Sequence, residues 1–125
     1  MDKFDVLRKY FGYSSFRKGQ EEMVDCLLSG RDALGIMPTG AGKSICYQVP
    51  AIMFGGVTIV VSPLISLMKD QVNALVQQGV KAAYINSSLT DTQYDKVLKN
   101  AALGNYKIIY VAPERLDSVG FINLC

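Results

Sequence analysis

The sequence predicts an α/β fold, a three-layer α/β/α arrangement in which helices cover both faces of a parallel sheet. Two observations carry this prediction. Short apolar runs rich in β-branched residues alternate along the chain with longer segments of helical period. The runs are apolar on both faces, and right-handed crossovers would place the intervening helices on both sides of the sheet.

Four strands are expected, and each of the runs that predict them is followed by a small or turn-forming residue. In such a sheet, ligands bind at the carboxyl ends of the strands, so the residues after each run are candidate site residues. The expected strands are Ala33–Met37, Val57–Val61, Ala82–Ile85 and Ile108–Val111.

Five helices are expected, two before the first strand and three between strands. Thr90 and Gln93 form a capping box at the start of the last helix. Ser62 is expected to cap the fourth helix, with Pro63 at its first position. The expected helices are Asp2–Tyr10, Lys18–Leu28, Lys43–Phe54, Pro63–Gln78 and Asp91–Leu103.

The composition sets limits on the kind of protein. A chain of 125 residues, half of them hydrophobic, is enough for one domain with a real core. The formal charge is only +2, so any nucleic-acid surface must be local. Cys26, Cys46 and Cys125 form no CxxC pair and the chain has no histidine, which excludes a zinc site built from these residues. The cysteines are expected to be reduced and packed.

We expect neither a signal peptide nor a membrane span. Asp2, Lys3 and Asp5 interrupt the position where an apolar signal segment would begin. The stretch from Ile45 to Met68 carries no charge, but proline and paired glycines break it into helix, turn and strand. The expected location is therefore the cytoplasm.

A phosphate-binding loop follows the first expected strand. Met37–Ser44 matches the pattern Gly-x-x-x-x-Gly-Lys-Ser/Thr, except that Met37 replaces the first glycine. The two glycines let successive amides point at one phosphate, Lys43 bridges the outer phosphates, and the Ser44 hydroxyl is placed to ligate Mg²⁺. A chance glycine turn before a helix is the alternative. The expected contact residues are Thr39, Gly40, Ala41, Gly42, Lys43 and Ser44.

Three residues before this loop are candidates for reading the base. The Gln20 amide can donate to and accept from one adenine edge, Tyr13 offers a stacking face, and Arg17 could lie flat against the purine. No Asn-Lys-x-Asp guanine signature occurs, which disfavours GTP. By themselves these are ordinary surface and hinge residues.

The motifs together resemble, in order and at similar spacing, the opening motifs of RecQ-family DNA helicases. The resemblance implies a RecA-like P-loop lobe that binds ATP with Mg²⁺ and recognises adenine through Tyr13, Arg17 and Gln20. Lys18 departs from the family, which usually has proline there. The motifs are Phe11–Tyr13, Phe16–Arg17, Gln20, Met37–Ser44, Val61–Gln71 and Ala112–Leu116.

The resemblance also implies a division of the chain and a surface for single-stranded DNA or DNA junctions. Residues 1–30 would form adenine-recognition helices and 31–125 a P-loop α/β core. The segments after three expected strands would face DNA. The alternative is that these residues form only a cap, a turn and a local ion pair. The DNA-binding candidates are Ser62, Pro63, Asn86, Ser87 and Arg115.

The family's activity is ATP-dependent 3′-to-5′ unwinding of DNA in replication, recombination and repair, with Lys43 as the catalytic residue in this part. It would place a bacterial protein at the nucleoid. The family next needs an Asp-Glu-Ala-His motif and a second motor lobe, and this sequence contains neither. We therefore expect an incomplete lobe that is nearly inactive alone. The alternatives are a catalytically silent nucleotide-binding or interaction module and, less favoured, a small-molecule kinase.

Overall fold

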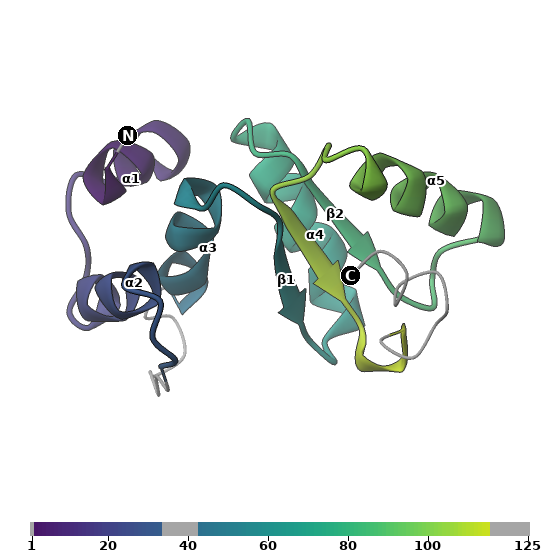
Figure 1. The fold of residues 1–125 in the computed structure, drawn as a ribbon, viewed down its shortest axis with the longest axis horizontal. Helices are drawn as coiled ribbons and strands as arrows, with labels where there is room; N and C mark the ends of the chain where they lie inside the picture. Colours follow the sequence, from purple (N-terminus) through teal and green to yellow (C-terminus); the bar gives the residue numbers. More distant parts are fainter. Residues whose placement is uncertain (1, 34–42, 116–125) are drawn as a thin grey trace. The chain divides into compact units, whose positions relative to one another are not determined.

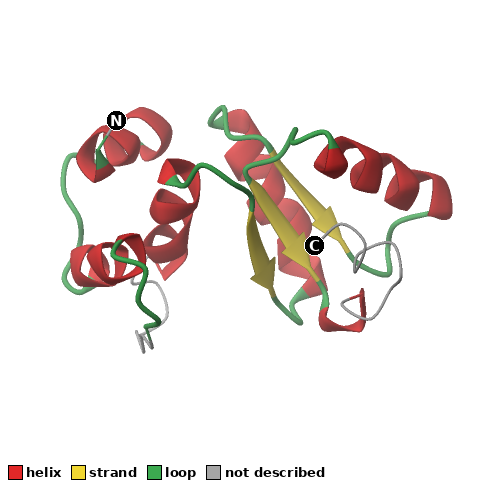
Figure 2. Ribbon diagram, viewed as in Figure 1, coloured by secondary structure: helices red, strands yellow, loops and turns green. Residues whose placement is uncertain are grey.

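The computed structural model describes residues 2–33 and 43–115. Within them the chain divides into two compact units, Met1–Gly55 and Gly56–Cys125. Figure 1 labels their elements and Figure 2 separates helices from strands. The first unit contains α1 (Lys3–Phe11), α2 (Gln20–Leu28) and α3 (Lys43–Met53). The second contains β1 (Thr58–Val61), α4 (Ile65–Gln77), β2 (Ala82–Ile85), α5 (Asp91–Ala102), β3 (Ile108–Val111) and the short 3₁₀ helix η1 (Pro113–Arg115).

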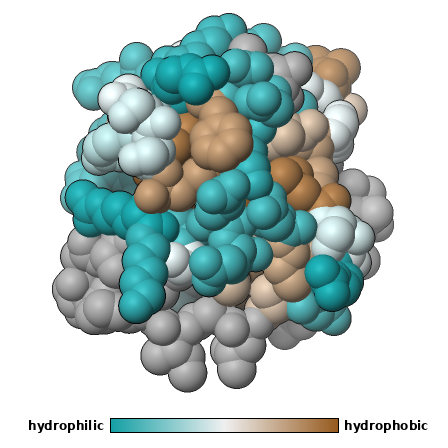
Figure 3. All heavy atoms as spheres, turned by 90° about the vertical axis from the view of Figure 1, so that its left-hand side faces the viewer, coloured by the Kyte–Doolittle hydropathy of each residue, from teal (hydrophilic) through white to brown (hydrophobic). Residues whose placement is uncertain are grey.

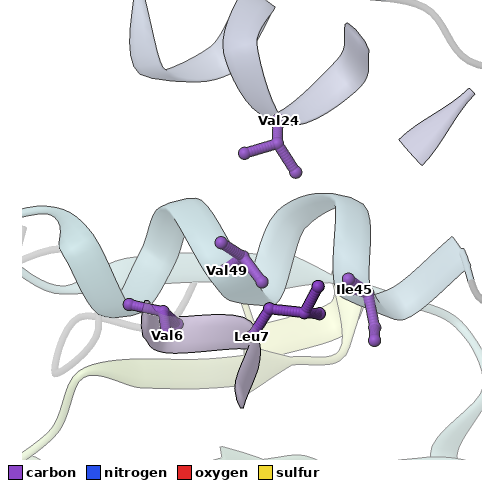
Figure 4. Packing of buried hydrophobic residues seen from close by; sticks show 5 residues of the cluster. All are labelled: Val6, Leu7, Val24, Ile45 and Val49. Carbon is purple, nitrogen blue, oxygen red and sulfur yellow. The ribbon is translucent and has the colours of Figure 1, made fainter. Parts of the chain in front are cut away.

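The first unit is a packing of three short helices around one aliphatic cluster. Figure 4 shows side chains from all three helices pointing into it. With the partly buried side chains that pack against the cluster included, each helix supplies apolar residues three or four positions apart, as an amphipathic helix does when one stripe faces a core. Helices of 9 to 11 residues are marginal alone, so this contact is what stabilises them. The cluster consists of Val6, Leu7, Val24, Ile45 and Val49.

Backbone conformation explains where the first two helices differ from expectation. Asp2 is the N-cap of α1, in a capping box with Asp5, and Gly12 ends the helix in the left-handed region at φ 75°. Gly19 precedes α2 with φ 85°. A residue at positive φ cannot belong to a right-handed helix, so α2 begins at Gln20 and not at Lys18.

The apolar stretch that follows Lys43 folds as a short helix and a strand. Pro50 lies inside α3, and the helix continues past it, because the Phe54 amide donates to the Pro50 carbonyl at 2.9 Å. Gly55 and Gly56 separate α3 from β1. In the described part of the chain, no helix has the length and apolar character needed to span a membrane.

The second unit is built on a parallel sheet with strand order β1-β3-β2. Its three strands confirm three of the four predicted from the sequence, with Val57 left out of β1. Of the fourth, Ala33–Met37, only Ala33 is described and it lies in a loop; the rest falls outside the described residues. The central strand β3 is buried along its whole length, as expected for a strand with neighbours on both sides.

Helices cover both faces of this sheet, which confirms the α/β class. Ile85, Ile109 and Val111 pack against Tyr94 of α5. Because side chains alternate along a strand, the residue after Ile85 points to the other face. There the Asn86 amide contacts Met68 of α4 at 3.5 Å, and Figure 1 shows α4 passing behind the strands.

One predicted helix cap is confirmed and one is wrong. The Thr90 hydroxyl accepts from the Gln93 amide at 3.2 Å, and the Gln93 side chain accepts from the Thr90 amide at 2.9 Å. At α4, however, Leu64 is the N-cap and makes no side-chain cap bond. The Ser62 hydroxyl instead accepts from the Leu64 amide at 3.1 Å. This local turn competes with a helix cap, so α4 begins at Ile65.

Replacing Thr90 by alanine removes one half of the confirmed capping box. We expect Thr90→Ala to destabilise the chain by about 1 kcal/mol, because a helix amide loses its partner. Urea unfolding followed by circular dichroism measures this loss. The matched control is Thr92→Ala, which changes an exposed threonine at the second residue of the same helix. Equal losses in both variants would contradict the capping role.

Candidate nucleotide site and sheet edge

Two of the residues expected to hold phosphate and metal open helix α3. Lys43 is exposed and Ser44 is half-buried, and both lie in the first turn. That turn carries no acidic side chain, so the positive end of the helix dipole is not offset and fits an anion. The other four expected contact residues, Thr39, Gly40, Ala41 and Gly42, lie outside the described residues.

Gln20, the candidate for reading the base, is held by the backbone just before it. Its side chain is only 3% exposed. The Gln20 Oε1 atom accepts from the Arg17 backbone amide at 2.7 Å, and the Gln20 backbone amide donates to the Arg17 carbonyl at 3.0 Å. The bond from the Arg17 amide fixes the direction in which the Gln20 side chain points.

The other two base-reading candidates lie in the loop before α2. The Tyr13 side chain is 50% exposed, and the Tyr13 amide donates to the Leu7 carbonyl in α1 at 3.3 Å. Arg17 is exposed and precedes the turn that starts α2. Because α2 begins at Gln20, Arg17 lies outside the helix and is linked to Gln20 through a turn.

All described candidates for base and phosphate recognition belong to the first unit. Helix α2, which begins at Gln20, packs against α3, which begins at Lys43. Val24, one turn into α2, shares the cluster with Ile45, two residues after Lys43 (Figure 4). The first compact unit ends at Gly55. The division predicted between residues 30 and 31 instead separates the adenine-recognition helices from the P-loop core, and it stays a prediction.

Sequence reasoning missed an ion-pair cluster that ties α1 to α2. The Lys3 ammonium lies 2.6 Å from the Glu21 carboxylate and 2.6 Å from that of Asp25. Hydrogen bonds to Asp25 and then Glu21 raise the pKa of Lys3 above its ordinary value. The available signal was the spacing of the two acids, since residues four apart lie on one face of a helix.

The two described cysteines, Cys26 and Cys46, are thiols and form no disulfide with one another. Cys46 is buried in α3, and burial raises the pKa of its thiol, which favours the protonated form. Cys26 is half-buried, and its Sγ lies 3.7 Å from the Asp32 carbonyl oxygen. Cys125 lies outside the described residues. Among residues 2–33 and 43–115, no three side chains of the metal-binding types gather as a metal site would require.

Three candidate nucleic-acid segments meet at one edge of the sheet. Val61, Ile85 and Val111 end β1, β2 and β3 and stand in register. The Ser62 amide donates to the Val111 carbonyl at 3.1 Å, and the Ala112 amide donates to the Ile85 carbonyl at 2.9 Å. The segments that follow all three strands therefore leave the sheet side by side.

At this edge, the structure gives Asn86 a different surrounding from the one expected. We expected its amide to be a donor for DNA, but the side chain is 1% exposed. Its nitrogen contacts the Met68 sulfur, and its oxygen accepts from the Ser88 amide at 2.8 Å and from the Ser88 hydroxyl. These are the contacts of a turn, because both polar ends of the side chain are engaged inside the protein.

The remaining edge candidates differ in how accessible they are. Pro63 and Ser87 are exposed, and Ser62 is half-buried. Three backbone amides at the start of α4 already have acceptors: the Leu64, Ile65 and Leu67 amides donate to Ser62, Pro63 and Leu64. The backbone of Arg115 lies in η1, and its side chain falls outside the described part.

Charged side chains of α1 and α2 lie at the surface of the first unit. On the face that Figure 3 turns toward the viewer, hydrophilic side chains predominate and surround smaller hydrophobic areas. The Lys3 cluster and the Asp5–Arg8 ion pair, 2.7 Å long, supply charged groups on α1 and α2. A hydrogen bond from the Asp2 backbone, followed by the Arg8 guanidinium, lowers the pKa of Asp5.

Comparison with known proteins adds an independent finding. Residues 17–123 match the family model for "DEAD/DEAH box helicase". The chain is 53% identical over 120 residues to "ATP-dependent DNA helicase RecQ" of Pasteurella multocida, covering 96% of this chain and 19% of that protein. It is 52% identical over 120 residues to the Bacillus subtilis protein of the same name, covering 95% and 20%.

A more distant relative gives the same picture. The chain is 39% identical over 117 residues to "ATP-dependent helicase wrn-1" of Caenorhabditis elegans, covering 94% of this chain and 11% of that protein. The chain thus spans about a fifth or less of the length of these relatives.

The burial of Asn86 leads to a prediction about stability. We expect Asn86→Ala to destabilise the chain by about 1–3 kcal/mol, because buried hydrogen bonds are lost and the Ser88 amide loses its acceptor. Ser87→Ala, at the exposed neighbour, is the control and should change stability by less than about 0.5 kcal/mol. Thermal unfolding measures both. An Asn86→Ala protein as stable as the Ser87→Ala protein would argue against the turn role.

Proposed function

Since this chain belongs to the DEAD/DEAH box helicases, we propose that it forms the ATP-binding front part of the first motor lobe of an ATP-dependent, 3′-to-5′ DNA helicase. The observation that carries the proposal is the composition of the first unit. The candidates for base recognition, in the loop before α2 and at its first residue, lie in one packed unit with the candidates for phosphate recognition on α3. The names of the relatives, which describe ATP-dependent DNA helicases, support the same activity.

The base would be read by Gln20. Adenine presents a donor at N6 beside an acceptor at N7, whereas guanine presents two acceptors there. The Gln20 oxygen, already oriented by the Arg17 amide, would accept from N6, and its nitrogen would donate to N7. Guanine O6 would instead oppose the Gln20 oxygen. Tyr13 would stack on the base, and the Arg17 guanidinium would lie along the purine.

The triphosphate would lie at the start of α3. Lys43 would act as a point charge on the outer phosphates, supported by the helix N-terminus. Ser44 would hold Mg²⁺ through its hydroxyl, and the loop residues Thr39 to Gly42 would supply backbone amides. The metal, when bound, would neutralise charge that develops on the phosphates.

DNA would bind at the carboxyl edge of the sheet. The exposed Pro63 and Ser87, the half-buried Ser62 and the Arg115 side chain are the proposed contacts to a single strand or a junction. Asn86 would shape the turn that presents Ser87, as its internal bonds indicate. The second motor lobe of the same enzyme is the proposed partner of this part.

Loss of Lys43 provides the first test of the nucleotide site. We expect the 125-residue chain to bind ATP with Mg²⁺, and Lys43→Ala to weaken binding about 10- to 100-fold, the value of a hydrogen bond to a charged group. Isothermal titration calorimetry on folded protein measures both. Lys96→Ala, an exposed lysine on α5, removes the same charge from the second unit and should leave ATP affinity unchanged.

The same proteins test the wider proposal through hydrolysis. With no Asp-Glu carboxylate pair after any expected strand, the chain should bind ATP without appreciable turnover, with or without single-stranded DNA. Turnover stimulated by DNA and abolished by Lys43→Ala would mean that another carboxylate here, such as Glu114, activates water. Phosphoryl transfer to a small molecule, unaffected by DNA, would point to a kinase and overturn the proposal.

Base recognition gives a second prediction. Gln20→Ala should remove about 1–3 kcal/mol of the preference for ATP over GTP, because a bidentate contact to adenine is lost. Gln20→Glu is the sharper variant, since it keeps an acceptor for the Arg17 amide while replacing the donor that adenine N7 requires. Binding constants for both nucleotides measure the preference. Gln77→Ala, exposed on α4, is the control, and equal losses of ATP and GTP affinity in the Gln20 variants would refute the adenine assignment.

A further inference from the structure

Helix α1 contacts the segment that carries the base-reading candidates and the helix that follows it. That segment runs from Gly12 to Gly19 between α1 and α2. It contains Tyr13 and Arg17 and leads directly into Gln20. A loop of this length is adjustable unless something fixes it, so its contacts with α1 decide its shape.

At the α2 end, the contact is the Lys3 ammonium. It bridges Glu21 and Asp25, at 2.6 Å to each carboxylate. The two acids are four residues apart and lie on one face of α2. Glu21 directly follows Gln20 in the sequence, so Lys3 holds the first turn of α2 at the residue next to the base-reading amide. The side chain of Lys3 is only 18% exposed, which limits its freedom to swing away.

Within the loop, the contacts are an aromatic pair and a backbone bond. The rings of Phe4 and Phe16 lie 5.6 Å apart between centroids, tilted by 56°, within the range for favourable aromatic pairs. Phe16 directly precedes Arg17, whose amide donates to Gln20 Oε1. Near the other end, the Tyr13 amide donates to the Leu7 carbonyl of α1.

We propose that α1 positions the base-reading loop, with Lys3 and Phe4 as positioning residues that set the Arg17–Gln20 geometry and therefore the preference for adenine over guanine. This inference rests on the proposed function, because it concerns the same nucleotide site. Neither Lys3 nor Phe4 would contact the nucleotide itself. Lys3 holds the start of α2, Phe4 contacts the residue before Arg17, and both contacts help to keep the direction of the Gln20 oxygen.

The readout is the ratio of the GTP to the ATP dissociation constant. Both nucleotides carry the same triphosphate, so effects on phosphate binding cancel in the ratio and effects on base reading remain. Phe4→Leu should lower the ratio by about two- to fivefold, because the aromatic pair is lost while apolar volume is kept. Lys3→Met should also lower this ratio. Lys3→Arg should keep the ratio of the unmodified chain, since arginine can bridge both carboxylates.

A nucleotide-independent measurement accompanies the ratio. Hydrogen exchange of the Arg17 amide, the donor to Gln20, should be faster in Lys3→Met and Phe4→Leu than in the unmodified chain. Protection of the Val24 and Val49 amides, at the centre of the cluster, reports whether the unit is still folded. The control is Lys9→Met, a lysine of α1 whose ammonium lies over the Tyr10 ring of the same helix; it should change neither quantity.

The outcomes separate this inference from the function on which it rests. An unchanged ratio with unchanged Arg17 exchange in Lys3→Met and Phe4→Leu would overturn the inference. Equal weakening of ATP and GTP would also overturn it, because α1 would then only hold the unit together. If the Gln20 variants leave the ratio unchanged, the adenine assignment itself fails, whatever the α1 variants do to Arg17 exchange.

Discussion

Contact among five aliphatic side chains decides how the first unit works. Val6, Leu7, Val24, Ile45 and Val49 come from three helices that are too short to be stable separately. The candidate groups for the base and for the phosphates are separated by more than twenty positions in the sequence, and this cluster brings their helices together. A change in the packing of this cluster would move the base-reading candidates and the phosphate-binding candidates together, because their helices pack on one core.

In the second unit, the sheet places three short polar segments side by side at the carboxyl ends of its strands. Parallel strands in register end at the same level, so the segments after Val61, Ile85 and Val111 leave the sheet together. The turn at Asn86 shows the division of labour at such an edge. The buried Asn86 side chain holds the backbone of the turn, and its exposed neighbour Ser87 is the proposed contact.

The sequence predicted what depends on local pattern and missed what depends on distant contacts. Apolar runs located β2 and β3 to the residue, and the Thr90–Gln93 pattern located a cap, because both signals are short-range. The predicted start of α4 was wrong, because a serine hydroxyl can either cap a helix or form a local turn, and the Ser62 hydroxyl forms the turn with the Leu64 amide. Lys3 was not recognised, because its partners lie eighteen and twenty-two positions away and only the packing of α1 on α2 brings them near.

The strand order has a consequence for how the chain comes to be folded. The central strand β3 is the last of the three in the sequence, and β1 and β2 each pair with it and not with one another. During synthesis, the two earlier strands emerge with no partner in the described sheet and must wait until Ile108–Val111 has left the ribosome. Sheet formation is therefore a late, long-range step. Until then, two apolar segments have no strand partner, and unpaired strands of this kind are prone to wrong pairing.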